Sequence, residues 1–499
     1  MAENRRHLQP SKYRVFGDGP DLVPSFELYI SGKNVTQVTP LGSTILEVLT
    51  MVDYEDDVEL SSQITLHFEA KPISNQGQPI DFKAVLESKA LQEGNYIDLY
   101  IGYGNQKEFV DRCEVLKWLP NYDENGVHLT VKAQDGRHRL QASHRAKFKN
   151  VGRKKRKTSY TNLTDEQIVE KIAKKYGYKV DADKTEVRKR IRTAVSDTKV
   201  TATSVTSKTK KQTVLPSRVQ KADQTDWNFV RKLAKINDFD IWVDFQQSKD
   251  PANPIEGGSY VLHFKKKREI GVQPQYRFSY GPFNNGEIIS AKPDFSIKDK
   301  PTGVEVVHYD TSTKKIQTTV IDVDANAESM KLNGAIVGPN GLRAREEILS
   351  GARVRFTAFG QTIEAYSDKP FSSKNDALDF INRWLIVNER NLIQIDLVVV
   401  GVPSMRSRDI FEIEGLSSRL DGYYRATNVK HTFTPDGIYT TSIKGYKLLS
   451  AQLYQRPKRK VRSGPLITKW NRISRYGARD AISEDPKAEE ILKKFYRKK

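Results

Sequence analysis

Residues Phe109–Asp135 read FVDRCEVLKWLPNYDENGVHLTVKAQD, and residues Tyr423–Tyr446 read YYRATNVKHTFTPDGIYTTSIKGY. Each stretch is an alternating strand with a proline near its end, an acidic turn that closes at Gly126 or Gly437, and a returning strand that contains Thr. Two alternating strands around an Asp/Asn–Gly turn are typical of a β-hairpin. The pattern therefore predicts two hairpins of one kind, one in each half of the chain.

A further strand comes before each hairpin. Tyr96–Gly102 precedes the first and Phe411–Gly415 precedes the second, and both end in glycine. The turn glycine follows Val115 by eleven positions in the first hairpin and follows Val429 by eight in the second, a mismatch that we assign to loop length. The pattern predicts a duplicated β unit, although hairpins of this composition also arise separately. A chain with two similar units can form a ring with twice as many units as subunits.

Composition excludes several classes of protein. The chain has 499 residues, 37% of them hydrophobic, and a mean hydropathy of −0.62, which indicates an elongated or assembled protein. No apolar run approaches the roughly 18–20 residues of a membrane helix, and the first residues do not resemble a secretory signal. Cys113 is the only cysteine, so disulfides within the chain and cysteine-based zinc sites are excluded. We expect synthesis in the cytoplasm.

The net charge of +20 is concentrated in three segments. Residues 145–157 hold eight basic residues and no acidic one, residues 184–218 hold ten and two, and residues 451–499 hold fifteen and five. The rest of the chain therefore carries a net charge of −6. Blocks of like charge are typical of solvated or partner-seeking segments. Nucleic acid, an anionic surface and an acidic protein are all compatible partners.

The first part of the chain is expected to be all-β. An irregular arm, residues 1–23, leads into residues 24–143, where apolar and polar positions alternate in six or so short strands separated by turns. This spacing is typical of a barrel or sandwich.

An α/β insertion with basic loops follows over residues 144–257. Thr164–Gln167 has the composition of a capping box for a helix that Gly177 would end. A second helix is expected over Thr225–Ile236, followed at once by the strand FDIWVDF.

The β pattern returns in residues 258–324 and 393–450, which are expected to form a second barrel. A mixed segment, residues 325–392, interrupts it and holds one helix, about Lys374–Glu389, in which apolar residues recur at spacings of three and four. The predicted fold class is mainly β with α/β insertions: two antiparallel β-barrels, small α+β domains and an extended C-terminal arm, residues 451–499.

The C-terminal arm combines basic residues with isolated apolar anchors. It contains RPKRKVR and ends in a short helix with Asp485 as N-cap and Pro486 at the first helical position. This pattern favours docking on another subunit, and a disordered basic tail is the alternative. The candidate partner-binding residues of the basic loop and the arm are Arg153, Lys154, Lys155, Arg156, Lys157, Lys458, Arg459, Lys460, Trp470, Tyr476, Ile491, Leu492 and Phe495.

Sequence motifs for catalysis and metal binding are missing. There is no HExxH, no histidine pair at helical spacing, no GxSxG elbow and no GxxxxGK[ST] loop. Asp56 and Asp57 could serve as paired glycosidase carboxylates, but the composition of Tyr54–Glu59 predicts a solvated, charged turn. We therefore expect no enzyme, no cofactor and no metal.

Nucleic-acid binding is the second hypothesis. The basic runs at 153–157 and 458–460 could meet phosphates. They lack the interleaved aromatic residues of a stacking platform, and the sequence has no helix-turn-helix, zinc-finger or RNP signature. Only non-specific binding is therefore kept as an alternative.

The order of segments resembles the tail hub (late control D) family of tailed bacteriophages, whose hub portion is shared with the type VI secretion spike protein. The resemblance rests on QKADQTDWNFVRKLAKINDFDIWVDF (220–245), placed between two β units, and on GYYRATNVKHTFTPDGIYTTSIKGY (422–446). It covers about residues 24–450. The DWNFVRKLA helix followed by an aromatic strand is its most specific motif.

The resemblance implies a homotrimer in which the two tail-tube-like barrels of each subunit alternate around a ring. Such a ring would join a hexameric tail tube to a three-fold spike and let DNA pass through its channel, which a mildly acidic body suits. The implied location is the virion tail baseplate, assembled in the host cytoplasm. A tail-tip carbohydrate-active enzyme is the third hypothesis.

The resemblance also implies the partners. A tail tube or distal tube protein would bind one face of the ring. The chain has no carboxy-terminal β-helix or OB-like spike module, so we expect a separate spike protein to bind it. We expect the arm 451–499 to reach a wedge or another baseplate protein.

Overall fold

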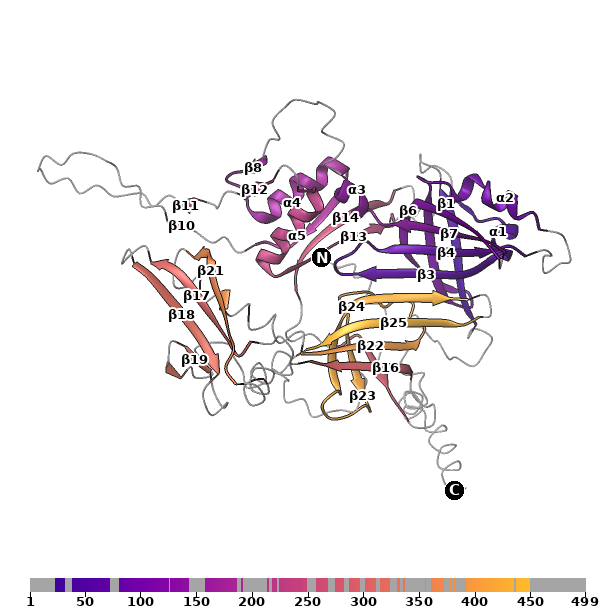
Figure 1. Ribbon diagram of the computed structural model, residues 1–499. Coiled ribbons are helices and arrows are strands. Elements are labelled where there is room, and N and C mark those ends of the chain that lie inside the picture. Colours follow the sequence, from indigo (N-terminus) through magenta and orange to yellow (C-terminus); the bar gives the residue numbers. More distant parts are fainter. Residues whose placement is uncertain are drawn as a thin grey trace, which may run out of the picture.

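A computed structural model (Figure 1) gives the arrangement of the chain. It describes residues 23–31, 38–71, 80–124, 126–142, 158–185, 190–191, 213–214, 218–221, 224–248, 257–267, 274–281, 287–296, 301–310, 315–323, 330–332, 335–336, 355, 360–371, 377, 380–381, 384, 392–434 and 437–448. The predicted fold class is confirmed: the protein is mainly β, with α/β insertions.

Two sets of six strands, here called the first and second β units, make up most of the sheet. The first β unit consists of β1 (Pro24–Ser31), β3 (Leu49–Asp57), β4 (Gln63–Glu69), β5 (Tyr96–Tyr103), β6 (Gln106–Asp123) and β7 (Gly126–Gln134). The second consists of β15 (Tyr276–Ser279), β16 (Ile288–Phe295), β22 (Ile393–Val400), β23 (Ile410–Glu414), β24 (Gly422–Phe433) and β25 (Tyr439–Lys447). The first unit also carries β2 (Val38–Pro40), α1 (Ser43–Glu47), α2 (Phe82–Leu86) and a 3₁₀ turn, Lys89–Leu91.

The two units have the same strand order, so the predicted duplication is confirmed. Their neighbours run β1-β5-β6-β7-β4-β3 in the first unit and β15-β23-β24-β25-β22-β16 in the second. Numbered along the chain, both orders are first, fourth, fifth, sixth, third, second. The units differ in one pairing: β1 is antiparallel to β5, whereas β15 is parallel to β23.

Two pairs of β-bulges fix the residue correspondence between the units. The long strands β6 and β24 shift register against their hairpin partners after Val115 and after Ala426. Strands β3 and β16 shift after Leu49 and after Ile288. Val115 therefore matches Ala426, not Val429 as we expected.

This correspondence reduces the expected difference in loop length from three residues to one, because Val115 pairs with Ala133, eighteen positions on, and Ala426 pairs with Gly445, nineteen positions on. Gly126 and Gly437 each come eleven residues after their matched bulge residue. The Val115/Val429 alignment was wrong because it placed the bulge differently in the two hairpins.

The two units share one continuous sheet. Strand β24 of the second unit pairs antiparallel with β3 of the first, from Asn428 opposite Asp57 to Phe433 opposite Val52. In Figure 1 the yellow-orange β24 lies beside the indigo β3, and β4 and β7 continue the stack on one side while β25, β22 and β16 continue it on the other. One apolar core runs beneath both units, with contacts such as the rings of Phe26 and Phe433, whose centroids are 5.7 Å apart.

The α/β domain between the units has its own core. Its helices are α3 (Arg137–Ala142), α4 (Asp165–Ala173), a 3₁₀ turn (Lys174–Tyr176) and α5 (Asp226–Asn237), and its strands are β8 (Thr158–Tyr160), β9 (Lys179–Ala182), β10 (Arg190–Ile191), β11 (Thr213–Val214), β12 (Arg218–Gln220), β13 (Phe239–Gln246) and β14 (Ser259–Lys266). The two predicted helices are confirmed with their local signals. The backbone N–H of Thr164 donates to Gln167 (3.0 Å), and Gly177 ends the helical segment at φ 73°. Thr225 caps α5 by accepting from the Asn228 N–H.

The ranges expected for the second barrel were partly wrong. Strand β14, in residues 258–324, pairs with β13 and β9 of the α/β domain. Strands β17 (Gly303–Asp310) and β18 (Lys315–Val323), in the same range, form a separate five-stranded sheet with β19 (Met330–Leu332), β20 (Ala335–Ile336) and β21 (Ile363–Phe371). Alternation indicates a half-buried strand but does not tell which sheet the strand joins. In the structure β14 pairs with the preceding strand β13, and β17 pairs with the following strand β18. Of the helix expected over Lys374–Glu389, the structure describes Ala377, Phe380, Ile381 and Trp384, all helical.

Candidate functional site

The thirteen candidate partner-binding residues, Arg153–Lys157, Lys458–Lys460, Trp470, Tyr476, Ile491, Leu492 and Phe495, lie outside the described residues. The same holds for the arms 1–22 and 451–499. The candidate site is therefore built from the sheet that joins the two units.

The solvent-facing side of the joined sheet carries paired polar side chains at the junction of β3 and β24. Glu55 and Asp57 of β3 both accept hydrogen bonds from the amide nitrogen of Asn428 on β24, at 2.6 and 2.9 Å. Lys430 Nζ lies 3.0 Å from Asp53, and the Thr432 hydroxyl donates to the same carboxylate at 2.7 Å. The acids of one unit are thus met by donors of the other.

Asp53 is the centre of these contacts. Burial opposes its ionisation, but hydrogen bonds from His67, Thr432 and Lys430 outweigh burial and lower its pKa. Asp53 therefore stays ionised at neutral pH, and its charge is balanced within the sheet.

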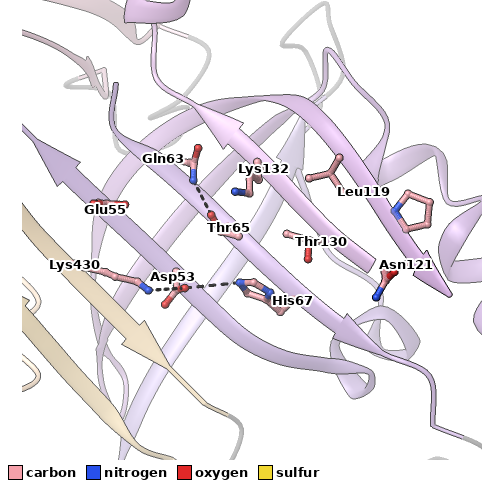
Figure 2. Close-up of a pocket in the computed structure, with 11 residues that line it drawn as sticks. Asp53, Glu55, Gln63, Thr65, His67, Leu119, Asn121, Thr130, Lys132 and Lys430 are labelled. Carbon is pink, nitrogen blue, oxygen red and sulfur yellow. Dashed lines mark hydrogen bonds and ion pairs between the residues drawn. The ribbon is translucent and has the colours of Figure 1, made fainter. Parts of the chain in front are cut away.

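A shallow depression of about 500 Å³ lies on this face. Figure 2 shows Lys430 reaching from β24 toward Asp53 and His67, while Thr130 and Lys132 point into the depression from β7. Leu119 and Asn121 of β6 border it. The described residues hold no group of three His, Cys, Asp or Glu side chains able to bind a metal ion. Its open lining of hydroxyls, amides and balanced charges provides a hydrated surface rather than an enclosed reaction site.

A buried charge cluster lies on the core side of the same junction. Asp56 of β3 accepts from the Ser407 N–H (3.0 Å) and from Arg408 Nη2 (3.1 Å), both in the second unit. It also accepts from the Ser62 hydroxyl (2.9 Å), and Arg137 lies 3.7 Å away. Burial raises the pKa of Asp56, but Arg408 and Arg137 outweigh burial and lower it to about 2.

Asp409 behaves in the opposite way beside this cluster. Burial dominates its surroundings and raises its pKa to about 7, although the N–H of Arg406 donates to it (2.8 Å) and the charges of Arg406 and Arg408 favour its ionised form. The nearby charge of Asp56 raises the pKa further. At neutral pH Asp56 is thus fully ionised, whereas the pKa of Asp409 lies close to the pH of the solution.

The α/β domain is fixed to both units. Tyr260 donates to the backbone oxygen of Arg112 in the first unit at 3.2 Å, and Arg425 of β24 forms an ion pair with Asp240 of β13. The Arg408 guanidinium also lies over the Trp242 ring, 4.7 Å from its centroid. The domain therefore spans the junction and restrains the angle between the units.

The sequence interpretation missed this site. Tyr54–Glu59 was expected to be a solvated turn, but Tyr54–Asp57 belong to strand β3, and Asp56 is only 3% exposed. That expectation was wrong because the acids of β3 are held by donors more than 350 residues away in sequence. The one local signal was the alternation of acidic and apolar residues in MVDYEDDV.

None of the helices in the described part of the chain combines the length and apolarity of a membrane crossing.

Two solved structures share the fold of this chain. One is the 43 kDa tail protein of prophage MuSo2 from Shewanella oneidensis, with a TM-score of 0.51 and 12% sequence identity. The other is a tail protein from Neisseria meningitidis MC58, with a TM-score of 0.51 and 8% identity. Each alignment covers 86% of this chain and 99% of the other. No protein-family model matches the sequence, and no curated protein does.

Proposed function

We propose that this protein is a structural hub of a phage tail baseplate. In this proposal three copies form a ring of six β units that joins a hexameric tail tube to a three-fold central spike. DNA passes through the channel of the ring. The two structures that share the fold are both tail proteins, which supports a place in a tail.

One observation carries the proposal: the chain contains two β units of the same strand order, joined edge to edge in one sheet. A three-fold assembly of such chains presents six similar units, so it can meet six-fold symmetry on one side and three-fold symmetry on the other. A single unit per chain would offer only three.

The polar face of the joined sheet suits a channel wall. DNA is held mainly by unpaired Lys and Arg at its phosphates. On this face Lys430 is paired with Asp53, and Glu55 and Asp57 accept hydrogen bonds from Asn428. The three acids offset the charges of Lys430 and Lys132, which both line the depression. Such a surface is hydrated and has little net charge, so a sliding duplex meets neither strong attraction nor a strong barrier.

The remaining parts of the proposal concern partners. The ring would bind a tail tube or distal tube protein on one side and a separate spike protein on the other. The basic arm 451–499 would contact a wedge or another baseplate protein. We propose no enzymatic role and no cofactor; wall degradation would belong to another protein.

The test is the mass of the purified protein in solution, measured across protein concentration and salt, with and without duplex DNA. We expect the mass to rise to three times 56.9 kDa and to stop there, unaffected by DNA. Salt-sensitive complexes with DNA would favour the nucleic-acid-binding alternative, and turnover of peptidoglycan would favour the carbohydrate-active one. Growth beyond three chains, or a single-chain mass at every concentration, would contradict the closed ring.

A further inference from the structure

The junction inside the chain is a template for a second junction. Strand β24 pairs with β3 along Asn428–Phe433. By strand order and by the matched bulges, β24 corresponds to β6, and β3 corresponds to β16. The pairing of β24 with β3 therefore has a counterpart, β6 with β16, that one chain does not make.

Both strands of that counterpart have an open edge in the described part of the chain. Strand β6 pairs with β5 only as far as Glu114, and beyond it no described strand lies on the side opposite β7. Strand β16 pairs with β22 and with no other described strand. Open edges of this length pair readily with another chain.

We infer that residues 117–122 of β6 pair antiparallel with residues 291–296, the end of β16 and the residue after it, in a second copy of this chain. The inference rests on the proposed function, because it names the contact that closes the ring. Transferring the β24·β3 register sets Trp118 opposite Phe295, Leu119 opposite Asp294 and Asn121 opposite Lys292.

The side chains of the two edges complement each other. Trp118 and Phe295 are half-buried and fall on the core side, where an aromatic pair stabilises a sheet. On the polar face, Lys117 lies diagonal to Asp294, and Lys292 lies diagonal to Asp123, so both diagonals join opposite charges. Leu119 and Tyr122 are 45% and 66% exposed in the single chain, and the pairing would cover them.

Two prolines weaken this contact relative to its template. Val58 N donates to Thr427 O (3.0 Å), so by alternation Tyr54 and His431 form a hydrogen-bonded pair across β3 and β24. Their counterparts are Pro293 and Pro120, which have no N–H to donate. The contact between chains therefore has two hydrogen bonds fewer than the junction within the chain, and the single chain is protected from indiscriminate edge pairing.

The contact also dictates the form of the assembly. It joins two different surfaces, so each copy uses β6 toward one neighbour and β16 toward the other, and such contacts give a ring when the rotation closes. Each chain then contributes the eight strands β16-β22-β25-β24-β3-β4-β7-β6 to one continuous wall.

Cysteine pairs test the register. Leu119→Cys and Asp294→Cys fall at a pair without mutual hydrogen bonds, where the Cα atoms are about 4.5 Å apart and a disulfide can form. We expect a mixture of the two single variants to give covalent dimers on mild oxidation, and the double variant to give covalent trimers as the largest species. Cys113 is buried and burial raises its pKa, so it should not react.

The chain supplies its own matched controls. Glu55→Cys with Lys430→Cys occupies the same place in the template and should give a disulfide within one chain. Leu119→Cys with Lys292→Cys is two residues out of register and should not cross-link.

The outcomes separate this inference from the proposed function. If wild-type protein reaches the mass of three chains and the Leu119/Asp294 pair stays reduced while the Glu55/Lys430 control oxidises, the strand pairing is wrong and the hub proposal stands. Covalent ladders beyond three chains would support the pairing and contradict the three-chain ring. A single-chain mass with no cross-link would overturn both.

Discussion

Strands β3 and β16 occupy the same place in the two units but have different surroundings. Both are the second strand of their unit, and both carry a bulge one residue after their first paired position. Strand β3 is paired on both sides, with β4 and β24, whereas β16 pairs only with β22 among the described strands. The comparison separates the features that both units share from the features that depend on which strand lies beside the outer edge.

The residues of the two strands follow that difference. Where β3 has Asp53, Tyr54 and Asp56, β16 has Lys292, Pro293 and Phe295. The acids of β3 receive donors from the second unit. The exposed charges and the proline of β16 are typical of an edge strand that has no partner inside its own chain. The two units share their strand order, and the residues of the outer edge differ with the neighbour of that edge.

The largest expected effect comes from breaking the buried side of the junction. Asp56→Asn leaves Arg408 and Arg137 without their shared carboxylate, which typically costs about 3–5 kcal/mol when one partner of a buried pair is removed. Denaturant unfolding followed by fluorescence measures the loss. Asp294→Asn, on the exposed edge of β16, is the control and should change stability by less than about 0.5 kcal/mol. Similar values for the two variants would show that the junction is not held by this cluster.

A smaller effect is expected at Asp409, whose counterpart in the first unit is Asn95. Both residues accept from the backbone of the matched bulge residue, Ala426 in one unit and Val115 in the other. The folded pKa of Asp409 is about 7, above the ordinary value of 3.8. The folded protein therefore holds a proton that the unfolded chain releases, and stability falls as pH rises from about 4 to about 7.

Asp409→Asn tests this by placing the residue of the first unit in the second. The variant has no charge to bury, so its stability relative to wild type should rise by about 2–3 kcal/mol between pH 5 and pH 8. Thermal melts at the two pH values measure the difference. Asp56 does not obscure it, because its folded pKa of about 2 means that its contribution is lost only as the pH falls from about 4 toward 2. An equal change at both pH values would show that Asp409 acts through packing alone.

The sequence predicts the local elements of this molecule well. The two hairpins, the capped helix that starts after Thr164 and the helix that starts after Thr225 follow from turn residues, caps and periodicity within a few positions. The duplication was also visible, because each copy repeats the same local signals.

The junction was not predictable from these signals. Asn428 and Asp57 are 371 positions apart, and neither strand carries a sequence signal that identifies the other as its partner. Five of the six residues in Tyr54–Glu59 are polar or charged, and this composition predicts a solvated Asp56. The arginines that make its burial possible come from α3 and from the second unit. The strands β14 and β17 were assigned to the wrong sheet for the same reason. Alternation predicts which side chains of a strand face the core, but tertiary packing decides which strand pairs with it.

The smallest expected effect on stability concerns the open edge itself. Pro293→Thr restores an N–H that points away from β22, so no hydrogen bond of the single chain changes and unfolding should shift by less than about 0.5 kcal/mol. Association should change instead, because the new donor faces the edge that β6 of a second copy would meet. Sedimentation at several concentrations should show assembly at lower protein concentration than wild type, and Pro120→Thr should act in the same direction. Asp294→Thr is the control, because it raises strand propensity without adding an N–H donor at the open edge. If association rises equally in this control, strand propensity and not the new donor causes the effect. In that case β16 is a protected edge and not half of an interface.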